Sequence, residues 1–136
     1  MRIYKVQRIG GLMIVKAYLK GPEAIAYPKL LIDTGSTYTI IAQEILESIG
    51  CSPALAEERK RIVTASGYEM LPVVKVQRFS CLGCSVENGH VLAHTFPFGT
   101  YVDGLLGMDF LQRFLIDIRP FSGEVILRCE TGKKKN

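Results

Sequence analysis

The sequence has no long apolar segment. Its apolar runs, such as LLI at 30–32 and TIIA at 39–42, cover three or four residues, whereas a transmembrane helix needs about 20. The first ten residues, MRIYKVQRIG, alternate apolar and polar side chains, so they lack the continuous apolar core of a signal peptide. We therefore expect a soluble, cytoplasmic protein with no membrane partner.

A strong excess of one charge is also missing. The chain has 17 Lys and Arg against 13 Asp and Glu, a net charge of +4. The basic residues are scattered, apart from a small cluster at 59–61 and the three lysines at 133–135. Neither group is interleaved with aromatic residues, as a nucleic-acid-binding surface would be. We interpret both as solvent-exposed and expect no nucleic-acid partner.

Cysteines are few, at positions 51, 81, 84 and 129, and their spacing indicates no disulfide framework. Cys81 and Cys84 are followed by His90 and His94, which raises the possibility of a zinc site. The gap between the two pairs is five residues, whereas zinc sites of this kind commonly have about a dozen. We favour a cysteine-flanked hairpin turn with no metal or cofactor, and zinc remains the alternative.

The composition is that of one globular domain. The chain has 136 residues, of which 48% are hydrophobic and 22% charged, enough to bury a core. It shows no internal repeat, low-complexity segment or linker. We therefore expect a single domain over 1–136, with a disordered basic tail at 131–136.

The apolar pattern predicts a mostly-β fold with two short helices. Ala42–Ile49 has apolar residues at helical spacing and Gly50 as a stop. A second helical turn follows Gly107, with Phe110 as part of its buried face and Asp109 explained by the helix dipole. Alternation and turn residues predict strands over 2–9, 12–20, 24–32, 38–41, 61–65, 68–74, 75–80, 86–94, 115–118 and 124–128.

One carboxylate stands out. In KLLIDTGSTYTII, Asp33 comes directly after the apolar strand 30–32, and a charged Asp is seldom buried without a partner. The stretch is either a strand that ends in a turn or half of an active site. Asp-Thr-Gly alone is weak support for the second reading, but a glycine-tipped hairpin and a DGLLG segment follow it in order.

The ordered set LLIDTGS, TASGYEMLP and DGLLGMDFL resembles the retropepsin-like aspartic proteases, and the resemblance extends from about residue 12 to residue 128. It places the chain nearer to the cellular and bacterial branch than to the viral one, because Thr37 and Met108 stand where viral members commonly carry an ion pair. The implied fold is a closed β-barrel or sandwich with a flap hairpin over the site.

The resemblance also assigns the site residues. Asp33 would be catalytic, and Thr34, Gly35 and Ser36 would support it. Thr34 would brace its loop by a hydrogen bond across the pair of Asp-Thr-Gly loops. Gly35 would let the backbone approach the carboxylate, and Ser36 would donate to the outer carboxylate oxygen. The flap tip would be Ser66 and Gly67. The candidates for apolar substrate pockets are Tyr68, Met70, Phe98, Thr100, Val102 and Leu105.

The reaction needs two carboxylates that share a proton and hold a water between them. This chain has one Asp-Thr-Gly, and its other aspartates lack that context. The sequence thus predicts a homodimer that pairs two copies of Asp33, with the chain termini in the dimer sheet, acting as an aspartic endopeptidase on peptides or proteins. The alternative is a catalytically silent dimer that binds extended peptides and uses Asp33 as a structural hydrogen-bond acceptor.

Overall fold

The computed structural model describes residues 1–64, 66–97 and 100–128, and of Thr64 it describes the main chain only. The predicted tail at 131–136 lies outside these ranges. In the described part of the chain, strands dominate and the helices are short, so the mostly-β prediction is confirmed. The elements are β1 (Arg2–Lys5), β2 (Gln7–Ile9), β3 (Leu12–Lys16), β4 (Tyr18–Lys20), β5 (Ile25–Ala26), β6 (Lys29–Ile32), β7 (Ile40–Ala42), α1 (Gln43–Ser48), η1 (Pro53–Leu55), β8 (Arg59–Thr64), β9 (Gly67–Cys81), β10 (Cys84–His94), β11 (Gly104–Leu106), α2 (Met108–Leu111), β12 (Leu115–Arg119) and β13 (Glu124–Arg128).

The larger sheet follows the order β2-β3-β6-β11-β7-β10-β9-β4-β5, with β8 attached to β9. This path is open among the described strands, so the closed barrel of the sequence prediction is not seen. Only Ala17 separates β3 from β4, and its N–H donates to the Pro28 carbonyl (2.9 Å). The consecutive strands β3 and β4 therefore lie near opposite ends of the strand order. This connection bends the sheet around the core, although the strand pairs do not form a continuous ring.

Three predicted strands are interrupted, and the first is 12–20, which divides at Ala17 into β3 and β4. The expected strand 2–9 splits at Val6, whose N–H donates to the Gly123 carbonyl (2.9 Å), so β1 pairs with β13 and β2 with β3. The expected strand 24–32 splits before Pro28, which lacks an N–H for a strand ladder. Strand β1 joins β13 and β12 in a separate three-stranded sheet.

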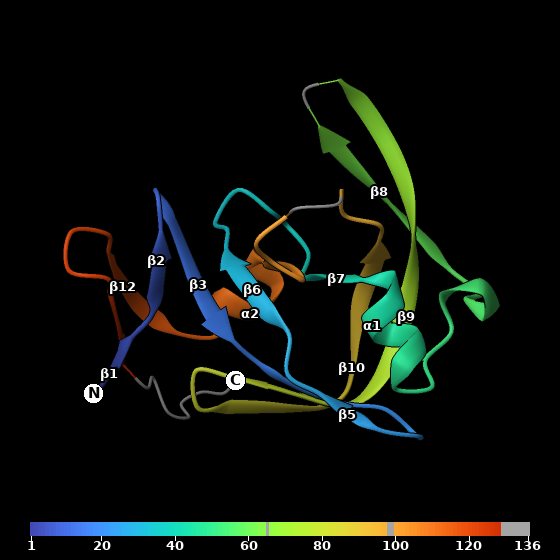
Figure 1. Cartoon of the computed structure of the whole chain (residues 1–136), viewed down its shortest axis with the longest axis horizontal. Helices are drawn as coiled ribbons and strands as arrows, with labels where there is room; N and C mark the ends of the chain where they lie inside the picture. Colours follow the sequence, from blue (N-terminus) through green and yellow to red (C-terminus); the bar gives the residue numbers. More distant parts are fainter. Residues whose placement is uncertain (65, 98–99, 129–136) are drawn as a thin grey trace.

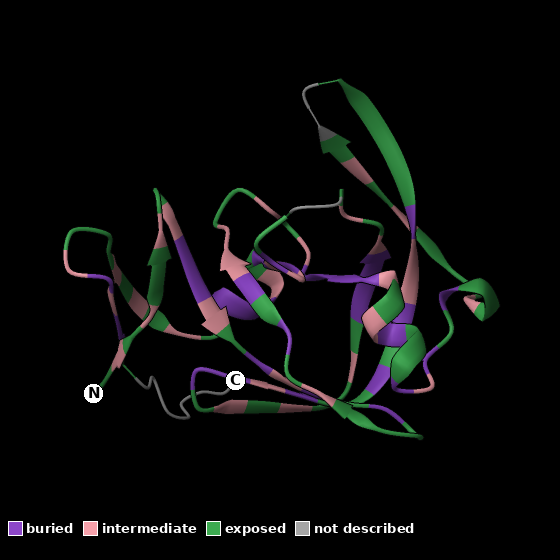
Figure 2. Ribbon diagram, viewed as in Figure 1, coloured by how far each residue is buried: buried purple, intermediate pink, exposed green. Residues whose placement is uncertain are grey.

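The β8–β9 hairpin stands clear of the rest of the molecule (Figure 1) and is mostly exposed (Figure 2). Residues 67–72 of β9 pair with β8, and the remainder of β9 pairs with β10 and β4. Thr64 pairs with Gly67 at the end of this ladder, so of the two predicted tip residues Ser66 lies in the turn and Gly67 lies in the strand. Gly67 is the first residue of β9 and has φ of +136°, a conformation that favours glycine.

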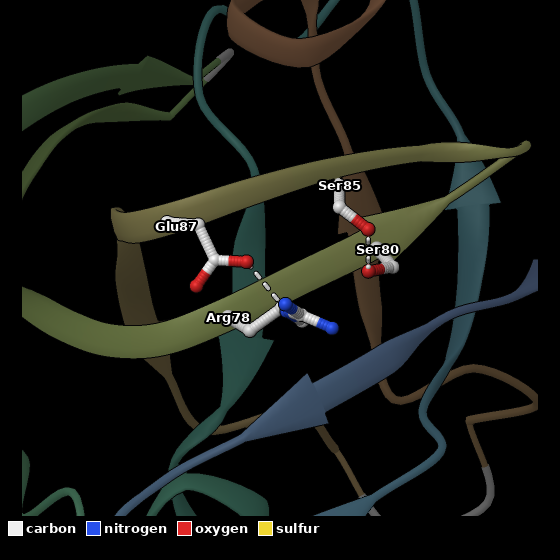
Figure 3. A network of polar contacts seen from close by, with 4 residues as sticks. All are labelled: Arg78, Ser80, Ser85 and Glu87. Carbon is white, nitrogen blue, oxygen red and sulfur yellow. Dashed lines mark hydrogen bonds and ion pairs between the residues drawn. The ribbon is translucent and has the colours of Figure 1, made fainter.

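The β9–β10 hairpin turns at the CLGC segment, as the sequence predicts. Cys81 pairs with Cys84 in the ladder, and Leu82 and Gly83 have φ of +51° and +78°, as a two-residue turn with two positive φ values requires. On one face of this hairpin (Figure 3) two cross-strand polar pairs, each with atoms 2.6 Å apart, follow one another: Arg78–Glu87 and Ser80–Ser85.

The core lies between the sheet and the two helices. Leu46 and Ile49 of the predicted helical stripe are fully buried, and α1 packs against β7 and β10. On the other helix Phe110 and Leu111 are buried, and the Phe110 ring meets the Phe79 ring edge-on at 5.3 Å between centroids. No helix in the described ranges is long and apolar enough to cross a membrane.

Candidate active site

Strand β6 ends at the Asp33 loop. The Asp33 N–H donates to the Leu106 carbonyl (3.0 Å), which ties the start of the loop to β11. The carboxylate accepts the Gly35 N–H at Oδ1 (2.9 Å) and is partly exposed. A Cβ at Gly35 would lie 3.2 Å from that same oxygen, so the prediction that glycine allows a close approach to the carboxylate is confirmed.

Strand β11 lies between β6 and β7 and so passes behind the loop that connects them. It runs parallel to β6 and antiparallel to β7, with Leu105 opposite Leu31 on one side and Ile40 on the other. A Cβ at Gly104 would overlap the Ile40 carbonyl. The glycine in this position is therefore needed for the central strand to fit between its neighbours.

Ser36 and Thr34 are the other two loop residues with predicted roles. The Ser36 hydroxyl donates to the Tyr38 carbonyl (2.7 Å), and since a hydroxyl has one proton, the prediction that it donates to the Asp33 carboxylate is wrong in this structure. The Thr34 side chain is exposed. Its predicted bond would cross to a second chain, so that role stays a prediction.

Thr39 and Asp109 form a contact that the sequence reasoning missed. Asp109 accepts the Thr39 N–H (3.1 Å) and the Thr39 hydroxyl (2.8 Å) on its two carboxylate oxygens. The residues are 70 positions apart, and no local pattern connects them. The sequence shows an acid two residues after the LLG segment, but the helix dipole explains it without a distant partner.

The β8–β9 hairpin, which the sequence predicts to be the flap, turns other residues towards the body of the molecule than those predicted. Strand alternation puts Ile62, Glu69 and Leu71 on one face of the hairpin. Ile62 and Leu71 on this inner face pack with Ile40, Leu92 and Leu105 in a small apolar cluster.

The outer face of the hairpin carries Tyr68 and Met70, which are 65% and 48% exposed. The structure thus does not bring these two pocket candidates to the inner face, because even-numbered and odd-numbered residues of a strand point in opposite directions. Ile62 and Leu71 lie on the inner face instead. The sequence gives no signal that separates the two faces, because apolar residues occur on both.

The remaining candidates are placed as follows. Leu105 belongs to the apolar cluster beneath the flap, and Val102 is buried. Thr100 is exposed, and its N–H and hydroxyl both donate to the Pro97 carbonyl (3.2 and 2.5 Å). Ser66 and Gly67 are exposed at the flap tip. Phe98 lies outside the described residues.

A cavity of about 340 Å³ borders the end of the loop at Thr39, beside helix α2 and strand β10. Its lining includes Thr39 and Asp109. Asp33 lies outside the lining of this cavity and is partly exposed.

The zinc alternative receives no support. Burial raises the pKa of the Cys81 thiol to about 12, whereas zinc binds the thiolate. Cys84 and His90 are six residues apart on β10, which separates them by about 20 Å. In the described part of the chain, no group of three or more His, Cys, Asp or Glu side chains is placed to hold a metal ion.

Comparison with known proteins gives a family and a fold. The model of the family described as gag-polyprotein putative aspartyl protease matches residues 27–113, well over half of the chain, from β6 to just beyond α2. No match was found among curated proteins.

Among solved structures, the chain is similar to a retropepsin-like aspartic protease from Rickettsia conorii, with a TM-score of 0.66 and 18% identity over 94% of this chain and 92% of that one. At this identity the likeness shows the fold, and the family match includes the Asp33 loop and the DGLLG segment. The chain thus has the retropepsin-like fold that the sequence predicts, and it belongs to the gag-polyprotein putative aspartyl protease family.

Proposed function

We propose that the protein is a homodimeric aspartic endopeptidase in which each subunit supplies one Asp33. The observation that carries the proposal is the Asp33 loop itself. Its carboxylate is partly exposed and fixed from within the loop by the Gly35 N–H (2.9 Å). A carboxylate held in this way at the surface can meet a symmetry-related copy.

The chemistry requires the second copy. Two carboxylates a few ångströms apart cannot both be ionised, so they share one proton. The ionised member removes a proton from a bound water, which attacks the peptide carbonyl, while the protonated member donates to the carbonyl oxygen. The chain has one Asp-Thr-Gly, and an isologous dimer brings two copies of the same residue together at its axis.

The three-stranded sheet β1-β13-β12 supports a dimer interface at the ends of the chain. Its outer strands, β1 and β12, each pair on one side only within the described residues. Open strand edges are available for pairing with a second chain. We place the subunit contact here, as the family resemblance implies.

The substrate is an extended peptide that lies between the Asp33 loop and the flap. The inner face of the flap and strand β11 offer Ile62, Leu71 and Leu105, which favour apolar side chains next to the cleaved bond. The hairpin projects from the body (Figure 1), so it can move to admit a peptide and then close over it.

The test is incubation of the protein and its Asp33→Asn variant with a diverse peptide library, with products identified by mass spectrometry. Cleavage by the native protein that disappears in the variant supports the proposal. Peptide binding without cleavage by either protein would instead favour the silent binding module. A monomer in sedimentation that still cleaves peptides would overturn the shared-dyad mechanism.

A further inference from the structure

Thr39 and Asp109 are joined more completely than a surface contact requires. Thr39 is 3% exposed, and both its N–H (3.1 Å) and its hydroxyl (2.8 Å) donate to the Asp109 carboxylate. The same hydroxyl oxygen accepts the Gly107 N–H (3.2 Å). The direction of the hydroxyl proton is therefore fixed, and one residue occupies both carboxylate oxygens.

This contact closes a set of bonds between two segments. The Asp33 N–H donates to the Leu106 carbonyl (3.0 Å) at the start of the loop. Further along, the Met108 N–H donates to the Ser36 carbonyl (2.7 Å) and the Asp109 N–H to the Thr37 carbonyl (3.0 Å). Residues 106–109 thus hold residues 33–39 from one end to the other.

The far end of this loop borders open space on one side. Thr39 and Asp109 both line the cavity of about 340 Å³, and Asp109 also lines a neighbouring one with Lys60 of the flap and Tyr38. Side chains that border a cavity have no neighbouring atoms on that side. Thr39 is buried on its other sides, so its hydrogen bonds to Asp109 add to packing in setting its position.

The helix dipole does not account for Asp109, so the sequence interpretation was incomplete. Helix α2 has four residues, too few for a large dipole. The carboxylate binds Thr39 of another segment, which a charge that merely stabilises its own helix would not need to do. A buried donor without an acceptor is costly, so loss of this carboxylate would let Thr39 and the loop shift.

We propose that Asp109 is a positioning residue, which acts through Thr39 to hold the loop that carries Asp33. The inference rests on the proposed function, since the position of the loop matters only if Asp33 performs chemistry. Asp109 does not touch the substrate. Its effect is on where the Asp33 carboxylate stands relative to its symmetry mate.

The test compares Asp109→Ala, Asp109→Asn and Thr39→Val with the native dimer. The control is Glu47→Ala, which removes an exposed carboxylate from α1. A displacement of about 1 Å at a reacting group costs about 10²-fold in rate, so Asp109→Ala should lower kcat by about 10- to 100-fold with little change in KM. Thr39→Val should do the same, because it removes the hydroxyl at nearly constant shape.

The Asn variant separates position from charge. Its oxygen can accept the Thr39 N–H, and its amide can donate to the Thr39 hydroxyl oxygen, so Asp109→Asn should recover kcat to within about threefold. The pH profile of kcat should keep its native shape. An Asn variant as impaired as the Ala variant, or one with a displaced acid limb, would overturn the inference because the charge would then be what matters.

Hydrogen exchange makes the result independent of activity. The Thr39 amide should exchange faster in Asp109→Ala than in the native protein, Asp109→Asn or Glu47→Ala. If the native chain cleaves nothing, the proposed function fails, but this exchange pattern still decides whether Asp109 holds the loop. If Asp109→Ala does not fold, Thr39→Val replaces it, and the rise in exchange should be smaller because residue 39 keeps its N–H bond to Asp109. Native exchange and native kcat in these variants would overturn the inference.

Discussion

The main chain of Gly107 lies directly against the main chain of Tyr38, so that a Cβ at Gly107 would overlap the Tyr38 carbonyl. This contact brings the DGLLG segment against the loop that begins at Asp33. It gives a physical reason for the glycine that was first noticed as part of a family pattern. Because backbone and not a flexible side chain occupies the space, neither partner can move aside cheaply.

Gly107→Ala should therefore destabilise the protein by about 1–3 kcal/mol, the usual effect of overpacking a close contact. Urea unfolding of the two proteins measures the difference. Gly11→Ala is the matched control, because a Cβ there would meet nothing within 4 Å. Equal stability of the two variants would show that the loop can shift to accept the added methyl group at little cost.

What the sequence could predict follows from how far each feature reaches along the chain. Alternation and turn residues identified the β9–β10 hairpin and the helical stripe at Leu46 and Ile49, because both depend on neighbours. The contact between Thr39 and Asp109 joins residues 70 positions apart. Its existence depends on β11 lying between β6 and β7, which spacing alone does not state.

The two faces of the flap show another limit of this reasoning. The β8–β9 hairpin was predicted correctly. Which of its two faces lies towards the site depends on the twist of the hairpin and on its attachment to the body at Leu71 and Val73. Tyr68 and Met70 were chosen because large apolar residues suit a pocket. A residue can be apolar and still lie on the outer face, since an exposed apolar side chain is common in folded proteins.

The flap tip should tolerate little change. Gly67 has φ of +136°, and a Cβ there would meet nothing within 4 Å, so a larger residue causes backbone strain without a clash. Strain of about 1–3 kcal/mol in a hairpin that must open and close should lower kcat/KM by about tenfold or more. Because the hairpin stands clear of the core, the melting temperature of Gly67→Val should change little.

Peptide cleavage and calorimetry together test the Gly67→Val expectation, with Gly11→Val as the control in another exposed turn. A flap variant with native turnover would mean that the tip does not move over the substrate. A large drop in melting temperature would instead show that the hairpin is part of the cooperative core.

The inner and outer faces of the flap should differ in their effect on substrate. Ile62→Ala removes apolar surface that faces the cluster with Leu105, and loss of such contacts typically changes kcat/KM by about tenfold. Tyr68→Ala, on the outer face and 65% exposed, should change it by less than about twofold. A peptide series with different apolar residues measures both. The reverse ranking would show that the hairpin turns over when substrate binds.

Cys81 should make stability fall in alkaline solution. Burial raises the pKa of its thiol from 9.0 to about 12. The folded state therefore holds the proton more tightly, and this contribution is complete below pH 9 and is lost as the pH rises from 9 towards 12. The slope in that window is about 1.4 kcal/mol per pH unit.

The measurement is urea unfolding from pH 8 to pH 11 for the native protein and Cys81→Ala. The variant should be less stable at pH 8, because a buried side chain is truncated, but its stability should fall less steeply with pH. Cys84, which is partly exposed, provides the control: Cys84→Ala should keep the native slope. Identical slopes in all three proteins would mean that Cys81 is not protected from solvent.

The central prediction concerns the number of intact carboxylates that each active site needs. If every site consists of two copies of Asp33, chains carrying Asp33→Asn should inactivate native chains by forming mixed dimers when both kinds of chain are refolded together. With about a nine-fold excess of variant, random pairing leaves about one native chain in ten with a native partner. Activity per native chain should therefore fall about tenfold, because loss of the general base from one subunit removes the shared-proton pair. The same excess of Glu47→Ala chains, which retain Asp33, should cause no loss. Activity per native chain that does not depend on the excess would mean that one chain is sufficient, and the dimeric mechanism would then have to be abandoned.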